Sequence, residues 1–191
     1  MTRVQLLFVT GAAAAALVLG AAGARAQDAD RPFTGTYIGP EVGVSIVDTG
    51  GGSSAEFLYG GRLGYRYQSA SGWVLGIEGR AGDTTFSQSG SLLGVPITTK
   101  LGRSLGGVAL IGYALGPGRR HLLFVGGGID NTRITVRAGN TTSGATNTVG
   151  TVTAGYEWAA SARLSLRLGG EIVKPNGVRE VRITGGLFLR F

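Results

Sequence analysis

The chain has 191 residues, 43% of them hydrophobic, and a formal net charge of +7. Its 36 glycines follow no Gly-X-Y period, which excludes collagen, and its apolar content is too high for a disordered linker. It has no cysteine, which excludes disulfides and thiolate metal sites. Its basic residues are scattered, so we expect no nucleic-acid binding and regard anionic lipid or lipopolysaccharide as the better partner for this charge.

The first 26 residues have the pattern of a secretory signal peptide. Arg3 provides the positive start, an apolar stretch follows over residues 6–19, and Ala24-Arg25-Ala26 forms a small-x-small cleavage site. The stretch is short for a membrane-spanning helix, and polar residues follow it at once. We therefore expect residues 1–26 to be cleaved and residues 27–191 to form a single domain.

The rest of the chain alternates apolar and polar residues with period two and gives no sustained helical period. The alternation predicts strands at about 34–47, 56–68, 73–82, 100–115, 121–136, 151–158, 163–172 and 181–191. The last of these is 11 residues long, enough to cross a bilayer at a tilt. The strands at 100–115 and 121–136 alternate less cleanly, so the sequence leaves their facing open.

The connections between these strands alternate in length. Short ones lie near 69–72, 116–120 and 159–162, and longer ones near 48–55, 83–99, 137–147 and 173–180. Eight antiparallel strands with short turns at one end and long loops at the other predict an all-β, up-and-down transmembrane barrel, with both termini on the periplasmic side.

One parity of the strands is charged and rich in glycine. An eight-stranded barrel has an interior only just wide enough for side chains, so inward glycines would make room for long ones. We expect buried glutamates and arginines to pair there, because burial requires compensation of charge. This structural lumenal network would contain Glu41, Glu56, Arg62, Arg66, Glu78, Arg80, Glu157, Arg163, Arg167, Glu171, Arg182 and Arg190.

The opposite parity is aliphatic and aromatic, and we expect it to meet lipid. Several aromatic residues fall near predicted strand ends, where the interfacial girdles of membrane barrels lie. They are Tyr37, Tyr65, Tyr67, Trp73, Tyr113, Tyr156 and Trp158. The sequence therefore predicts an exported protein of the bacterial outer membrane.

Four segments resemble the small OmpA-like, porin-superfamily barrels of proteobacterial outer membranes. They lie at residues 33–39 (FTGTYIG), 60–79 (from GGRLGYRYQ to WVLGIEG), 164–167 (LSLR) and 186–191 (GLFLRF). The resemblance implies that the strand ending in Phe191 is the signal read by the outer-membrane assembly machinery.

The chain departs from the pattern of this family at two places. Val108 and Leu110 stand where members often carry inward arginines, which predicts a smaller charge network on that side. Pro40 stands where the family favours glycine, and because proline lacks a ladder donor we expect a bulge or an early strand end there.

Catalytic and metal chemistry find little support. His121, the only histidine, lies at a short turn with no serine within several residues, so a Ser/His arrangement is not expected. With one histidine and no cysteine, metal ligands would have to be carboxylates, and Asp48, Asp83 and Asp130 are isolated from other acids. We expect no cofactor, no metal and no enzymatic activity.

The residues and the resemblance together favour a non-enzymatic outer-membrane surface protein. It would serve envelope integrity, surface interaction such as adhesion or ligand capture, or both, through four extracellular loops. Its partners would be membrane lipid, lipopolysaccharide, the assembly machinery and a host or small-molecule ligand at the loops. Two alternatives remain open: a lipid A-modifying outer-membrane enzyme and a soluble exported ligand-binding barrel.

Overall fold

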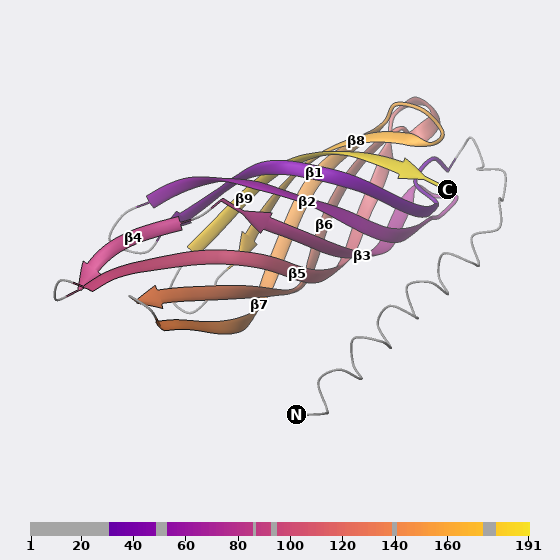
Figure 1. Ribbon diagram of the computed structural model, residues 1–191. Helices are drawn as coiled ribbons and strands as arrows, with labels where there is room; N and C mark the ends of the chain where they lie inside the picture. Colours follow the sequence, from indigo (N-terminus) through magenta and orange to yellow (C-terminus); the bar gives the residue numbers. More distant parts are fainter. Residues whose placement is uncertain (1–30, 49–52, 86, 93–94, 139–140, 174–178) are drawn as a thin grey trace, which may run out of the picture.

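Antiparallel strands close into a barrel in the computed structural model, which describes residues 31–48, 53–85, 87–92, 95–138, 141–173 and 179–191 (Figure 1). The strands are β1 (Gly35–Asp48), β2 (Ser53–Gln68), β3 (Trp73–Thr84), β4 (Ser87–Leu92), β5 (Val95–Leu115), β6 (His121–Ala138), β7 (Thr141–Ala159), β8 (Leu164–Val173) and β9 (Arg179–Arg190). Because β3 pairs directly with β5, and β1 with β9, eight strands form a closed ring. Strand β4 is an addition that pairs with β5 beyond the end of β3. The eight-stranded antiparallel barrel is thereby confirmed.

One end of the barrel carries short turns, as predicted. Gly72 ends the first of them with φ +99°, and its carbonyl accepts a hydrogen bond from the Ala114 amide at 2.8 Å. The second contains a 3₁₀ turn, η1 (Pro117–Arg119), and both Gly116 before it and Gly118 within it have positive φ. The C-terminus lies at this end (Figure 1). No helix in the described part of the chain is long and apolar enough to cross a membrane.

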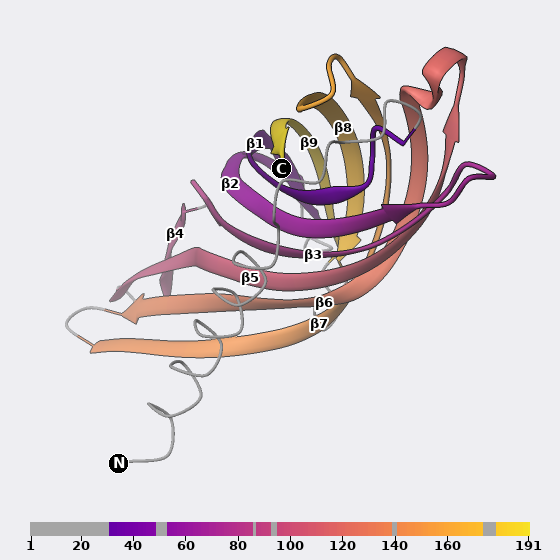
Figure 2. The same cartoon turned by 90° about the vertical axis from the view of Figure 1, so that its right-hand side faces the viewer.

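The opposite end differs from the predicted pattern of long loops. Most of 83–99 and 137–147 is strand, because β4 forms a hairpin with β5 while β6 and β7 continue to Ala138 and from Thr141. These four strands project together past the barrel (Figures 1 and 2). The prediction was wrong here because an apolar–polar alternation marks strands with one buried face, and the threonine-rich start of β7 is largely exposed.

The structure settles the facing of β5 and β6. The continuous apolar run at the start of β6 divides by parity: Leu122 and Phe124 point inward and are 0% and 5% exposed, whereas Leu123 and Val125 point outward. Where β5 continues beyond the ring, the β5–β6 register shifts between Leu101 and Ser104.

Pro40 produces neither a bulge nor a strand end, so that prediction was wrong. It lies opposite Gly61 in an unbroken β1–β2 register. On the other side, Ile38 pairs with Leu189 and Glu41 with Gly186, so the register is the same before and after the proline. The proline lies in a gap in the β1–β9 ladder, where its missing amide donor interrupts pairing without changing the spacing.

The outer wall is apolar and the inner wall is charged. Outward side chains such as Ile77, Val152 and Leu168 are each 60% exposed or more, and exposed large apolar residues surround the barrel. Such a surface belongs in hydrocarbon. The predicted girdle aromatics are exposed except Tyr37, which is 1% exposed and points inward because it shares the parity of Glu41.

Candidate functional site

The lumen brings together ten of the twelve residues predicted to lie there. They are Glu41, Arg62, Arg66, Glu78, Arg80, Glu157, Arg167, Glu171, Arg182 and Arg190, and all are buried. Glu56 is only half-buried and lies near the loop end of β2, and Arg163 is exposed in the turn before β8, so the prediction was wrong for Arg163. Asp130 and Glu180, which the sequence analysis did not assign to the lumen, are buried there. Six acidic side chains thus face six arginines.

A four-membered ring of ion pairs lies nearer the short-turn end. Arg66 and Arg167 each contact both Glu78 and Glu157, and all four contacts are 2.8 Å long. The Ser165 hydroxyl donates to Glu157 at 2.6 Å, and the Tyr37 phenol donates to Glu78. Because the two arginines are shared between two carboxylates, this lower layer ties β2, β3, β7 and β8 together across the lumen.

Aromatic rings pack against the lower layer. The Arg66 guanidinium lies 4.2 Å from the centroid of Tyr37, and that of Arg167 lies 4.3 Å from the centroid of Phe188. The Phe124 ring is 5.2 Å from Arg167. These rings exclude water from the ion pairs and interact favourably with the cations through their faces.

An upper layer lies nearer the loop end. Asp130 accepts from Arg182 at 2.6 Å and contacts Arg80 at 2.7 Å, and Arg182 also contacts Glu180 at 2.7 Å. Arg80 also pairs with Glu171. Arg62 adds a further pair to the lower layer, because it contacts Glu78 at 3.2 Å and Glu41 at 2.6 Å.

The mouth of the barrel at the short-turn end is closed by the segment before β1. The Phe33 amide donates to the Gln68 side chain at 3.0 Å, and the Gln68 amide donates to the Thr34 hydroxyl at 3.0 Å. Phe33 is completely buried, and the Arg190 guanidinium lies 4.9 Å from the centroid of its ring. This end of the lumen is therefore capped by side chains.

Inward glycines make the space that the long side chains occupy. A Cβ added at Gly76 would lie 2.7 Å from Arg66 Cγ, and one added at Gly106 would lie 2.7 Å from Arg80 Nε. At Gly64 the added atom would lie 2.5 Å from the Tyr37 hydroxyl oxygen. The high glycine content thus has a packing explanation on the inner wall.

The filled lumen leaves little free volume. Among the described residues, a cavity of about 10 Å³ lies between side chains that include Arg62, Arg80 and Arg182. That is about the space one water molecule requires. The geometry fits a solid structural core and not a solute channel.

His121 lies outside the lumen, at the short-turn end of β6. Its Nδ1 is 2.6 Å from the Tyr156 hydroxyl, and the two rings stack with centroids 6.0 Å apart. This partner is a phenol, whereas a nucleophilic relay joins histidine to a serine and a carboxylate. Among the described residues, no group of three or more histidine, aspartate or glutamate side chains could hold a metal ion.

A closed barrel with an apolar outer wall and a charged, filled lumen defines a small transmembrane β-barrel. A family model described as the outer membrane protein beta-barrel domain matches residues 13–191, and the chain belongs to this family. The protein is accordingly a β-barrel of the Gram-negative outer membrane.

Solved structures of other small outer-membrane barrels share the fold. The attachment invasion locus protein Ail of Yersinia pestis is 17% identical, with a TM-score of 0.63 over 83% of this chain and 99% of Ail. Neisserial surface protein A is 16% identical, with a TM-score of 0.60 over 83% of this chain and 98% of its own. A further Ail structure, with a TM-score of 0.57, is a complex with the heparin analogue sucrose octasulfate and covers 83% of this chain and 100% of that one. No curated protein matches this chain significantly.

Proposed function

We propose that this protein is a non-enzymatic surface barrel that supports the outer envelope and captures a polyanionic ligand at its extracellular end. The observation that carries the proposal is the sheet formed by the outer parts of β4, β5, β6 and β7, which projects beyond the ring (Figure 1). We call it the extracellular sheet. The described side chains near the start of β7, at residues 142–146, are exposed and mostly polar. The described part of the lumen is filled by paired side chains around a cavity of about 10 Å³, which favours this sheet as the place for an interaction.

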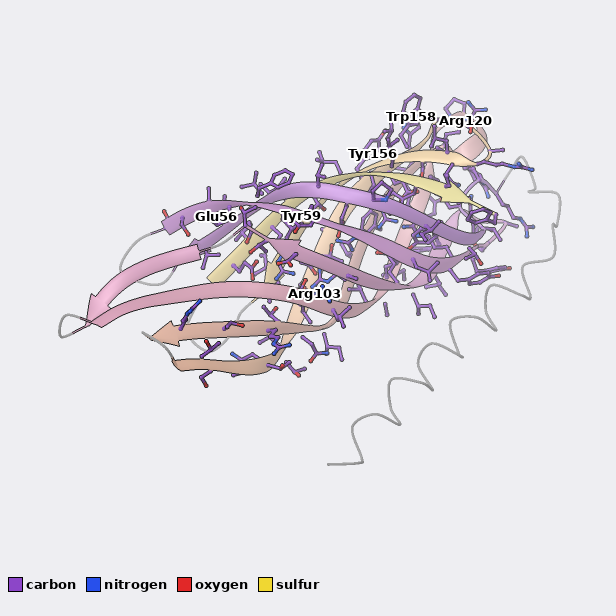
Figure 3. All side chains as sticks on the ribbon, viewed as in Figure 1. Glu56, Tyr59, Arg103, Arg120, Tyr156 and Trp158 are labelled. Carbon is purple, nitrogen blue, oxygen red and sulfur yellow. The ribbon has the colours of Figure 1, made fainter. Side chains whose placement is uncertain are left out.

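Two arginines lie side by side where the extracellular sheet leaves the apolar band. The last large apolar residues on the outward parity are Leu105 on β5 and Ile129 on β6, and both are more than half exposed. The exposed Arg103 and Arg133 follow, at the place where the β5–β6 register shifts. Figure 3 labels Arg103. Like charges on adjacent strands repel each other, so an anion bridging them would be stabilised.

The acidic side chain closest to this pair by register is Asp83. It follows Gly82, which pairs with Ser104, and its Oδ1 accepts from the Thr84 amide at 2.8 Å. The two arginines thus carry one more positive charge than Asp83 can neutralise. This excess of positive charge would favour binding of a phosphate or sulfate ester.

The ligand class that we propose has two sources. Phosphate groups of lipopolysaccharide occur in the same leaflet, and sulfate groups occur on host glycans. The heparin analogue bound by Ail, a barrel of the same fold, supports a sulfated glycan as one candidate. Phosphate and sulfate esters are both recognised by guanidinium groups through charge-assisted hydrogen bonds.

Whole cells provide the test, because only extracellular residues meet an added polymer. Cells carrying the unaltered barrel should bind labelled heparin, and the double variant Arg103→Gln/Arg133→Gln should bind it roughly five- to thirtyfold more weakly, at about 1 kcal/mol or less per exposed charge pair. Purified barrel titrated with lipopolysaccharide tests the other source. The matched control is Arg119→Gln/Arg120→Gln, which removes the same charge at the periplasmic end. The proposal would be overturned if the Arg103→Gln/Arg133→Gln variant bound heparin and lipopolysaccharide as strongly as the unaltered protein does.

Export by cleavage of residues 1–26 is part of the same proposal. The mature protein would then begin at Gln27. The intact mass of barrel purified from outer membranes should equal that of residues 27–191. A mass that includes the first 26 residues would contradict cleavage without affecting the ligand proposal.

A further inference from the structure

A hollow of about 420 Å³ lies on the lipid-facing wall across β5, β6 and β7, beside the start of β3. Outward residues line it, among them Trp73, Tyr113, Leu123, Val125 and the small Ala154. Ala154 pairs with Gly170 on β8, so two small outward residues lie next to each other beside the large ones that line the hollow. A Cβ added at Gly170 would meet nothing within 4 Å.

The basic turn between β5 and β6 lies just beyond this hollow, toward the periplasm. Val125, in the hollow, is four residues from His121 at the start of β6, or about 13 Å at roughly 3.3 Å per strand residue. Arg119 and Arg120 come directly before His121. Each leaflet contributes about half of the ~30 Å hydrocarbon core, so an acyl chain seated in the hollow would place its phosphate near these arginines.

Positive charge dominates this rim. Arg120 is exposed, and half-buried Arg119 donates one hydrogen bond to the Ala70 carbonyl. The carboxylate of Glu157, the next acidic side chain along β7, is buried in the lumen and paired with two arginines. The terminal carboxylate of Phe191 follows β9, three strands away around the ring from β6. Figure 3 shows Arg120 beside Tyr156 and Trp158 at this end of the barrel.

We propose that the outer wall of β5–β7 is a binding site for one anionic phospholipid of the periplasmic leaflet. One acyl chain lies in the hollow over Ala154, and the phosphate binds the guanidinium groups of Arg119 and Arg120. The aromatic rings of Trp73 and Tyr113, packed edge to face with centroids 5.4 Å apart, border the hollow near the level of the headgroups. Cationic side chains at a membrane surface attract acidic lipid in this way.

The chain contains its own probe for this site. Trp73 and Trp158 are its only two tryptophans, and both are exposed on the outer wall at the short-turn end. Their fluorescence therefore reports on lipid at this rim. The full mature barrel is reconstituted in phosphatidylcholine vesicles that contain a small fraction of either brominated phosphatidylglycerol or brominated phosphatidylcholine, and quenching by the two is compared.

Brominated phosphatidylglycerol should occupy the site roughly five- to thirtyfold more than brominated phosphatidylcholine at equal mole fraction, since each arginine near a membrane contributes about a factor of five. Arg119→Gln/Arg120→Gln should abolish this preference. Arg103→Gln/Arg133→Gln, with the same loss of charge at the other end, should retain it. Ala154→Leu, which fills the hollow, should reduce quenching by both lipids.

Folding of each variant is checked by its altered gel migration without heating, so that a loss of preference is not a loss of structure. Equal quenching by the two lipids in the unaltered barrel would overturn the proposal. So would a preference that survives Arg119→Gln/Arg120→Gln, or quenching that Ala154→Leu leaves unchanged.

Discussion

Glu78 is the carboxylate on which the lower layer of the lumen most depends. It accepts from Arg66 and Arg167 at 2.8 Å, and from Arg62 at 3.2 Å. Glu78→Gln preserves the volume of the side chain and removes its charge, which leaves the lumen with one uncompensated cation. Breaking a buried ion pair in this way destabilises proteins by about 3–5 kcal/mol, and we expect a loss of this size in the free energy of unfolding.

Equilibrium unfolding of the mature barrel in guanidinium chloride, followed by tryptophan emission in micelles, measures this loss. Glu56→Gln is the matched control, because Glu56 is half-buried near the loop end, outside the ring of ion pairs, and its effect should stay within about 0.5 kcal/mol. The double variant Glu78→Gln/Arg66→Gln restores neutrality and should be less destabilised than the sum of its single changes by about 0.5–3 kcal/mol. The structural role of the network would be refuted if the losses in free energy of unfolding of the two single variants simply added up in the double variant. It would also be refuted if Glu78→Gln were no more destabilising than Glu56→Gln.

Three further predictions concern the wall, the histidine and the last residue. Gly106→Ala should destabilise the barrel by about 1–3 kcal/mol in the same unfolding assay, because its Cβ would lie 2.7 Å from Arg80 Nε. Gly107→Ala, at the adjacent outward position, should change the free energy of unfolding by less than about 0.5 kcal/mol, because the added Cβ would lie 3.9 Å from its nearest neighbour. His121→Ala should leave the mass spectrum of lipid A unchanged in cells, and a new lipid A species would support the enzyme alternative. Deletion of Phe191 should reduce the amount of folded barrel in outer membranes severalfold, whereas normal levels would show that assembly does not require it.

Most of the lumen could be predicted because strand parity is a local signal. Glu41, Arg66 and Arg167 all lie in segments where large apolar residues alternate with charged ones, and the narrow interior then decides which face turns inward. The girdle prediction is wrong for Tyr37 because nearness to a strand end does not decide which way a side chain points, whereas parity does. Parity alone would have placed it beside Glu41.

The remaining errors have identifiable physical causes. Asp130 lies on β6, where the run Leu122–Val125 hides the phase of the alternation, and its burial depends on Arg80 and Arg182 from distant strands. Glu180 falls within the connection predicted near 173–180, whereas β9 begins at Arg179. The start of β7 gives no apolar alternation because its described side chains, at residues 142–146, are exposed, so this part of the extracellular sheet depends on pairing between strands, which sequence periodicity does not show.

The central claim is that the aliphatic parity faces lipid and the charged parity faces the centre. Because the chain has no cysteine, single cysteines carrying a nitroxide label can be introduced at Ile77, Val152 and Leu168 on the outer wall and at Val108 and Thr153 on the inner wall. In bilayers, the outer labels should be accessible to dissolved oxygen and shielded from a water-soluble nickel complex, whereas the inner labels should be shielded from both. Outer labels that collide freely with the nickel complex would contradict the membrane barrel.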